Sequence, residues 1–151
     1  MSAIIIAVLV LATASTGAIF KPGEWYEDLR RPTWTPPNWA FPVVWSILYL
    51  AIGFAGWLVW EAQGMGLAIA LWFAQLVFNA VWSWLFFGRK RMDLAFVDVC
   101  LLFLTIVAFI LAAAQVSQMA ALLFLPYAAW VATAATLNRA VWRLNPDAAP
   151  A

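Results

Sequence analysis

The chain has 151 residues, of which 67% are hydrophobic and only 10% are charged, and its mean hydropathy is +0.92. A soluble domain of this length could not hide so much apolar surface from water, so the composition favours a membrane protein. The net charge of +1 offers no basic surface for nucleic acid. The chain has no His and one Cys, which removes the commonest metal ligand and general base and excludes an intrachain disulfide.

Residues 3–20 form the first apolar run, which is long enough to predict a membrane-spanning helix. A cleaved signal peptide is the alternative, because Ala12-Thr13-Ala14 resembles a small-residue cleavage site. No Lys or Arg precedes the run, so we favour the spanning helix. Lys21-Pro22-Gly23 is expected to end it.

The stretch from Trp25 to Tyr49 holds four of the eleven Trp and four of the eight Pro residues. A loop between spans is ordinarily polar, whereas this one is aromatic and stiffened by proline. We therefore interpret the part of it that precedes the second helix as a lid over an apolar cavity among the helices. Pro42 is expected to lie in the first turn of the second helix.

Four further helices are expected at about 42–62, 66–87, 92–114 and 119–143, separated by short polar or basic breaks. Pro126 is expected to bend the last of them. The fold prediction is an all-α membrane protein, a five-helix transmembrane bundle in one domain spanning 1–151. All basic residues then fall on one side, which the positive-inside rule assigns to the cytoplasm; they are Lys21, Arg30, Arg31, Arg89, Lys90, Arg91, Arg139 and Arg143.

Three of these helices carry aromatic or amide residues at helical spacing. The second places Trp45 and Tyr49 on one face, the third Gln75, Asn79 and Trp82, and the fifth Tyr127, Trp130, Ala134 and Leu137. An amide at mid-membrane depth needs a partner, either a ligand or a neighbouring helix. These stripes could line a cavity for a large planar hydrophobe or could simply pack helix on helix. Trp57, Trp60 and Trp142 lie near helix ends and are interpreted as an interfacial belt.

Asp98 lies about two turns into the fourth helix. An ionisable group there is a functional hypothesis, but we favour pairing with Arg89 or Arg91, or contact with interfacial water. Ala70 and Ala74 form a small-xxx-small pair on the third helix, which predicts a dimer contact.

Several motifs together resemble the TspO family of tryptophan-rich sensory proteins and translocator proteins. They are W-Y-x-x-L-x-x-P-x-W-x-P-P-x-W from Trp25, P-x-x-W-x-x-L-Y from Pro42, N-x-x-W from Asn79, F-F-G from Phe86, P-Y-x-x-W from Pro126 and L-N-x-x-V-W-R from Leu137. The resemblance covers nearly the whole chain. It implies a five-helix bundle, usually dimeric, that binds porphyrins, haem, sterols and isoquinoline carboxamides, with no obligatory cofactor.

The resemblance also implies the positions that contact the ligand. They are Trp25, Trp34 and Trp39 in the lid, and Trp45, Tyr49, Asn79, Trp82, Trp130, Ala134 and Leu137 in the helices. Some bacterial members are reported to promote light-dependent porphyrin breakdown, and Trp45 and Trp130 match the residues implicated. The expected function is therefore a membrane receptor for tetrapyrroles, with a photocatalyst or a transporter as alternatives.

Two positions depart from the family pattern. Animal members carry a cholesterol-recognition Tyr near the C-terminus, where this chain has Arg139 and Ala140. A Trp that animal members carry early in the fourth helix is Leu94 here. The expectations for sterols and for synthetic ligands are weakened accordingly.

Overall fold

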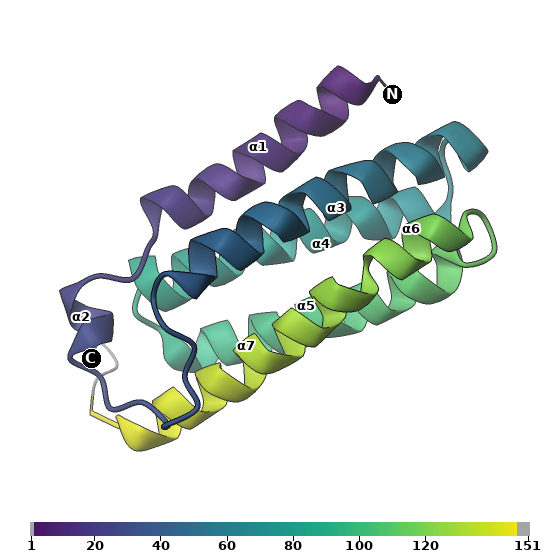
Figure 1. The fold of residues 1–151 in the computed structure, drawn as a ribbon. Coiled ribbons are helices and arrows are strands. Elements are labelled where there is room, and N and C mark those ends of the chain that lie inside the picture. Colours follow the sequence, from purple (N-terminus) through teal and green to yellow (C-terminus); the bar gives the residue numbers. More distant parts are fainter. Residues whose placement is uncertain (1, 148–151) are drawn as a thin grey trace.

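The computed structural model describes residues 2–147, and these residues form helices and loops with no strand among them. The helices, drawn in Figure 1, are α1 (Ala3–Ile19), α2 (Glu24–Glu27), α3 (Ala40–Gln63), α4 (Leu67–Ser83), the π-helical turn η1 (Trp84–Gly88), α5 (Met92–Ala113), α6 (Gln118–Leu123) and α7 (Leu125–Leu144). The prediction of an all-α membrane bundle is confirmed.

Among the described residues, four segments are long and apolar enough to cross a membrane: Ala40–Gln63, Leu67–Gly88, Met92–Ala113 and Gln118–Leu144. The first helix, Ala3–Ile19, is apolar but shorter. Large apolar side chains point away from the bundle, such as Leu50, which is 77% exposed, and Leu104, which is 62% exposed. Such an apolar exterior suits the hydrocarbon of a bilayer rather than water.

The last expected helix is divided into two parts. α6 ends at Leu123 and α7 begins at Leu125, with Pro126 in its first turn. Proline has no amide hydrogen to donate to the preceding turn, so the regular hydrogen-bonding pattern is interrupted there. The bend expected from Pro126 is therefore present, although we expected a single helix over 119–143.

The third expected helix also changes character near its end. Beyond Ser83 the chain widens into η1, and the Arg89 amide donates to the Trp84 carbonyl at 2.7 Å. Arg91 donates to the Leu85 carbonyl at 2.8 Å, which closes the turn before α5. A π-helical turn of this kind rotates the following side chains relative to a regular helix.

The long helices run side by side, with α1 lying along α3 and α4, and with α5 packed between α4 and α7 (Figure 1). One end of the bundle carries α2, the C-terminal end of α7 and the turn from α4 to α5, and we call it the basic end. The opposite end carries the N-terminus and the turns from α3 to α4 and from α5 to α6 (Figure 1). The basic loops of the sequence thus meet at one end, as the alternation of five helices predicts.

Tight packing closes the bundle towards the opposite end. Trp72 of α4 is fully buried, and its indole nitrogen donates to the Ile52 carbonyl of α3 at 2.9 Å. A Cβ at Gly56 would lie 2.3 Å from the Trp72 ring, so only glycine leaves room for it. Phe109 of α5 packs on Phe124 with ring centroids 4.1 Å apart. Aromatic side chains therefore fill this region completely.

Candidate ligand cavity

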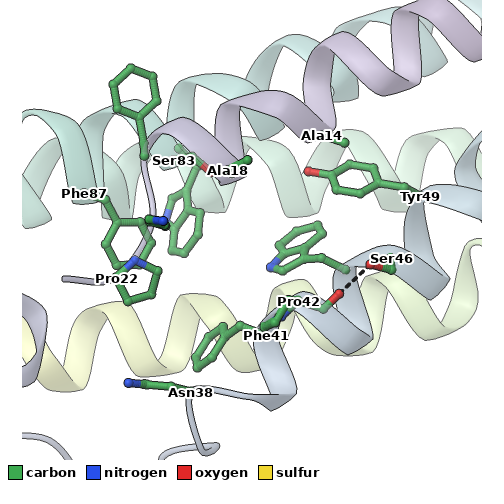
Figure 2. A pocket seen from close by; sticks show the side chains of 15 residues that line it. Ala14, Ala18, Pro22, Asn38, Phe41, Pro42, Ser46, Tyr49, Ser83 and Phe87 are labelled. Atoms are coloured by element: carbon green, nitrogen blue, oxygen red, sulfur yellow. Dashed lines mark hydrogen bonds between the residues drawn. The ribbon is translucent and has the colours of Figure 1, made fainter.

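A cavity of about 440 Å³ lies between the end of α1, the beginning of α3 and the end of α4 (Figure 2). Its size falls within the range of small-molecule sites. Ala14, Gly17 and Ala18 form the α1 side of the cavity. These small residues leave the space open, and a Cβ at Gly17 would meet no atom within 4 Å.

Aromatic rings form the other walls. Trp45 and Tyr49 come from α3 and stack on each other, with ring centroids 5.5 Å apart. Trp82 and Phe87 face them from α4 and η1. Trp130 of α7 lies behind Trp45 and packs on it edge to face, with ring centroids 6.5 Å apart. Flat faces from three helices are thus gathered at one place, whereas the helical spacing alone left a cavity and plain helix packing as alternatives.

A hydrogen-bonded chain of polar side chains leads from the cavity wall into the bundle. The Tyr49 hydroxyl donates to Asn79 Oδ1 at 2.9 Å, and Asn79 Nδ2 donates to the Tyr127 hydroxyl at 2.8 Å. Tyr127 in turn donates to Gln75 Oε1 at 2.8 Å. We call these four residues the polar chain. Asn79 is thereby satisfied by neighbouring helices and reaches the cavity only through Tyr49.

Trp82 is held in place by an amide that the sequence interpretation did not select. Its indole nitrogen donates to Asn138 Oδ1 at 3.0 Å, and Asn138 Nδ2 donates to the Met92 carbonyl at 2.9 Å. The buried Asn138 thus ties α4, α5 and α7 together. The sequence does carry a signal for Asn138, because it is an isolated amide in a stretch without charged residues. The same feature singled out Asn79.

Only the two ends of the segment between α1 and α3, which includes the lid, reach the cavity. Lys21, Pro22 and Asn38 line the cavity mouth, and the chain between them crosses the basic end of the bundle (Figures 1 and 2). There the Arg30 amide donates to Asn145 Oδ1 at 2.9 Å, and Asn145 Nδ2 donates to the Arg30 carbonyl at 2.8 Å. This pair of bonds fastens the middle of the lid to the end of α7.

A buried tyrosine anchors the beginning of the lid. Tyr26 is 2% exposed and packs edge to face on Phe87 at 5.6 Å. Burial raises the pKa of the Tyr26 hydroxyl above its ordinary value, while the nearby Arg31 guanidinium acts in the opposite direction. The guanidinium carbon lies 4.9 Å from the centre of the Tyr26 ring. The lid is therefore packed down on η1 rather than free.

Other residues expected at the ligand lie outside the cavity lining. Trp34 and Trp39 are 49% and 70% exposed. Trp25 packs against Phe86 at 5.9 Å. Ala134 and Leu137 are buried in α7. The structure brings Trp45, Tyr49 and Trp82 together around the cavity and places Asn79 and Trp130 directly behind them.

Trp130 has one unusual feature. Its indole nitrogen is buried and has no hydrogen-bond partner within residues 2–147, although its ring contacts both Trp45 and Phe41. A buried donor without an acceptor is costly. The N–H of Trp130 therefore lacks an acceptor among the described residues.

The expectation that Asp98 pairs with Arg89 or Arg91 is wrong. Arg91 forms its salt bridge with Asp93 at 2.9 Å, because the two residues flank the start of α5. Asp98 is 6% exposed, and its Oδ2 atom is buried without a partner in the part of the chain that the structure describes. Asp98 therefore faces the bundle interior rather than interfacial water.

The sequence profile of the TspO/MBR family matches residues 3–143. The chain is 42% identical to the tryptophan-rich sensory protein of Cereibacter sphaeroides over 134 residues, which cover 89% of this chain and 85% of the relative. It is 40% identical to the protein CrtK of Rhodobacter capsulatus, with 99% and 98% covered. It is also 40% identical to the human translocator protein, with 85% and 81% covered.

Proposed function

This chain belongs to the TspO/MBR family, and on that premise we propose that it is a multi-pass membrane receptor for porphyrins, including haem. The ligand would occupy the cavity between α1, α3 and α4. The observation that carries the proposal is the convergence of Trp45, Tyr49 and Trp82 from two helices on one cavity. Flat apolar faces of this kind suit a flat, apolar ring system.

The charge at the cavity mouth supports a ligand with acidic groups. Lys21 is the one charged residue among those that line the cavity. An ammonium group at the entrance attracts a carboxylate, while the apolar walls accept the ring. Porphyrins that carry propionate side chains combine both features. Sterols lack the acidic group and are a weaker match.

The placement of the basic residues supports an orientation in the membrane. The basic end would face the cytoplasm, because cytoplasmic loops of membrane proteins are enriched in Lys and Arg. The mouth of the cavity would then open on the cytoplasmic side, and the turns at the opposite end would face outward. A bacterial membrane is the setting we propose, since the two relatives described above that cover more of this chain are bacterial proteins.

A homodimer through α4 is a further part of the proposal. Ala70 is exposed and Ala74 is half-buried, and both lie on the outer side of α4 near the exposed Val77. Small residues on an outer face allow two helices to approach closely. Replacement of Ala70 by Leu should raise the monomer fraction in a crosslinking assay in lipid, whereas an unchanged dimer fraction would reject this contact.

One observation favours a second candidate, light-dependent porphyrin breakdown. Trp45 lies in contact with Trp130, and the indole nitrogen of Trp130 is free. Trp45 at the cavity wall, with Trp130 in contact behind it, could pass an electron to an excited porphyrin, which oxidises the indole and reduces the porphyrin. Breakdown of the ring would further need dioxygen as the oxidant. Illumination should then convert bound protoporphyrin to a new pigment with the wild type but not with Trp130→Phe, and equal conversion by both proteins would reject the candidate.

The receptor proposal is tested by titrating protoporphyrin into the protein in lipid nanodiscs and following the porphyrin absorbance. Saturable binding is expected, and Trp45→Leu should weaken it about tenfold by removing one wall. Trp57→Leu is the matched control, because Trp57 stacks on Phe54 outside the cavity and should leave binding unchanged. Equal affinity of the Trp45 variant and the wild type would overturn the assignment of the cavity.

A further inference from the structure

The lid contains a second hollow, which adjoins the ligand cavity. It has a volume of about 550 Å³ and is open to the surface, and its lining comes from one stretch of the lid: Leu29, Arg31, Pro32, Thr35, Pro36, Pro37 and Asn38. We call this space the lid hollow. Asn38 also lines the ligand cavity, and Figure 2 shows it at the border of that cavity. The two spaces are therefore neighbours that share Asn38.

The lid hollow offers a different kind of surface from the cavity. The lining of the cavity is mostly apolar, whereas that of the lid hollow is mostly polar. Its three prolines have no amide hydrogen to donate. The amide and the hydroxyl of Thr35 both donate to the Pro32 carbonyl, at 3.1 and 2.6 Å. The Arg31 guanidinium is therefore the principal donor that remains, and Arg31 is the one charged residue among those that line the lid hollow.

The surroundings of Arg31 hold it in place and leave its charge unpaired. The preceding residue, Arg30, is bound to Asn145 through both its amide and its carbonyl. The Arg31 guanidinium rests over the ring of Tyr26, which is itself buried. A guanidinium in such a position can still donate its N–H groups to an acceptor. Within residues 2–147 Arg31 forms no salt bridge, so its charge is available to an anion.

Each of the two adjoining spaces thus contains one positive group. Lys21 is the charged residue of the cavity, and Arg31 is that of the lid hollow. A carboxylate of the protein lies nearby, because Asn38 Nδ2 donates to Glu27 Oε1 at 3.4 Å, but Glu27 lines neither space. The prolines of the lid restrict its backbone, so the lid hollow is formed before a ligand arrives.

We infer that the lid hollow binds a second carboxylate of the ligand whose ring occupies the cavity. The first carboxylate lies at Lys21, and the second lies at Arg31, whose planar fork of N–H donors matches a carboxylate. The two propionates of protoporphyrin are on one edge of the ring, so both can point out of the cavity while the ring stays between the aromatic walls. The inference rests on the proposed function and adds that Arg31 selects flat ligands with two acidic groups on one edge.

Protoporphyrin and its methyl esters provide the test, because they share one ring system and differ in charge. The diacid has two free propionates, the monomethyl ester has one, and the dimethyl ester has none. Binding to protein in nanodiscs is followed by porphyrin absorbance, with empty nanodiscs subtracted. The wild type should bind the diacid about fivefold more tightly than the monomethyl ester, and the monomethyl ester about fivefold more tightly than the dimethyl ester, the size of one partly exposed ion pair in each step.

Variants of the lid identify the residue that binds the second carboxylate. Arg31→Gln should weaken binding of the diacid about fivefold, to the level of the monomethyl ester, and leave binding of the dimethyl ester unchanged. Arg31→Lys keeps the charge and should keep the diacid at least twofold ahead of the monomethyl ester. Arg30→Gln is the matched control, because it removes the same charge from the neighbouring, exposed residue, which lines neither space. It should leave all three affinities unchanged.

The outcomes separate this inference from the proposed function. Equal loss of diacid and dimethyl ester binding in Arg31→Gln would show that Arg31 only supports the lid, and would overturn the inference. An equal effect of Arg30→Gln would also overturn it, because only the general charge of the lid would then matter. A wild type that binds all three porphyrins alike would overturn it and leave the ligand cavity standing. If none of the three binds above the empty nanodiscs, the proposed function fails and the inference fails with it.

Discussion

The space between the helices is filled differently at the two ends of the bundle. Towards the outward end, α3 and α4 meet at Gly56, and the fully buried Trp72 fills the space between them. Towards the basic end, Trp45 and Tyr49 of α3 and Trp82 of α4 line a cavity that α1 borders with small residues. Tryptophan is used at both ends, so the residue type alone does not decide between packing and binding.

The neighbours of each tryptophan make the difference. The indole nitrogen of Trp72 donates to a backbone carbonyl, and its ring is seated against a glycine, so it has no surface to offer. Trp45 faces the small residues Ala14 and Ala18 of α1, which leave a gap in front of its ring. Close packing of α3 against α4 therefore holds the bundle together at one end, while the small residues of α1 leave space for the site at the other.

The largest expected effect is at the packed end. Gly56→Ala would place a Cβ 2.3 Å from the Trp72 ring, so either Trp72 moves or the helices separate. The free energy of unfolding should fall by about 3 kcal/mol, as in other overpacked cores. The measurement is unfolding in mixed micelles. Gly53→Ala is the matched control one turn earlier, where the new Cβ would lie 3.6 Å from Val10 and should be tolerated.

Trp82→Phe should affect both stability and binding. The change leaves the buried Asn138 Oδ1 without its donor, which costs about 2 kcal/mol in unfolding free energy. It also alters one cavity wall, so protoporphyrin affinity should fall in the same variant. Trp84→Phe is the control, since Trp84 is 44% exposed on the bundle surface. Equal stability of the two variants would contradict the role given to Asn138.

A larger side chain in the cavity should pack the basic end more tightly and leave less room for a ligand. Ala18→Leu on α1 inserts a larger apolar side chain into the space in front of Trp45, so protoporphyrin should bind about tenfold more weakly, or about 1.4 kcal/mol. Stability should be unchanged or slightly raised, because a void is filled. Ala12→Leu, on the exposed side of α1, should leave affinity unchanged. Undiminished binding by the Ala18 variant would place the ligand elsewhere.

The smallest expected effect concerns the lid. Asn145→Ala removes both hydrogen bonds to Arg30 and should lower the free energy of unfolding by about 1 kcal/mol. The amide of Arg30 should exchange its hydrogen faster, and bound porphyrin should dissociate faster, because the lid is released from α7. Asp147→Ala, two residues later on the exposed surface, serves as control. Unchanged exchange at Arg30 would show that the lid is held by other contacts.

The helices and part of the site could be predicted from periodicity. Trp45 and Tyr49 are four residues apart and Asn79 and Trp82 three apart, so helical geometry alone puts each pair on one face. What periodicity could not supply is which faces meet. The contact of Gly56 with Trp72, and the bonds of Asn138, depend on the relative rotation of separate helices.

For the lid, too, the sequence does not show which distant residues it contacts. Its proline and tryptophan content indicated a cover for the cavity, but its middle is attached to Asn145, which lies 115 residues away in the sequence from Arg30. Proline fixes the backbone locally and does not specify a distant partner. The expectation that Asp98 pairs with a basic neighbour failed for a similar reason, because Arg91 has a nearer partner in Asp93.

The most direct test is a structure of the protein in complex with protoporphyrin. We expect the ring system in the cavity, in contact with Trp45, Tyr49 and Trp82, with a propionate group near Lys21. A porphyrin bound on the lipid-facing surface, with the cavity in front of Trp45 unchanged and empty, would contradict the assignment of this cavity as the ligand site.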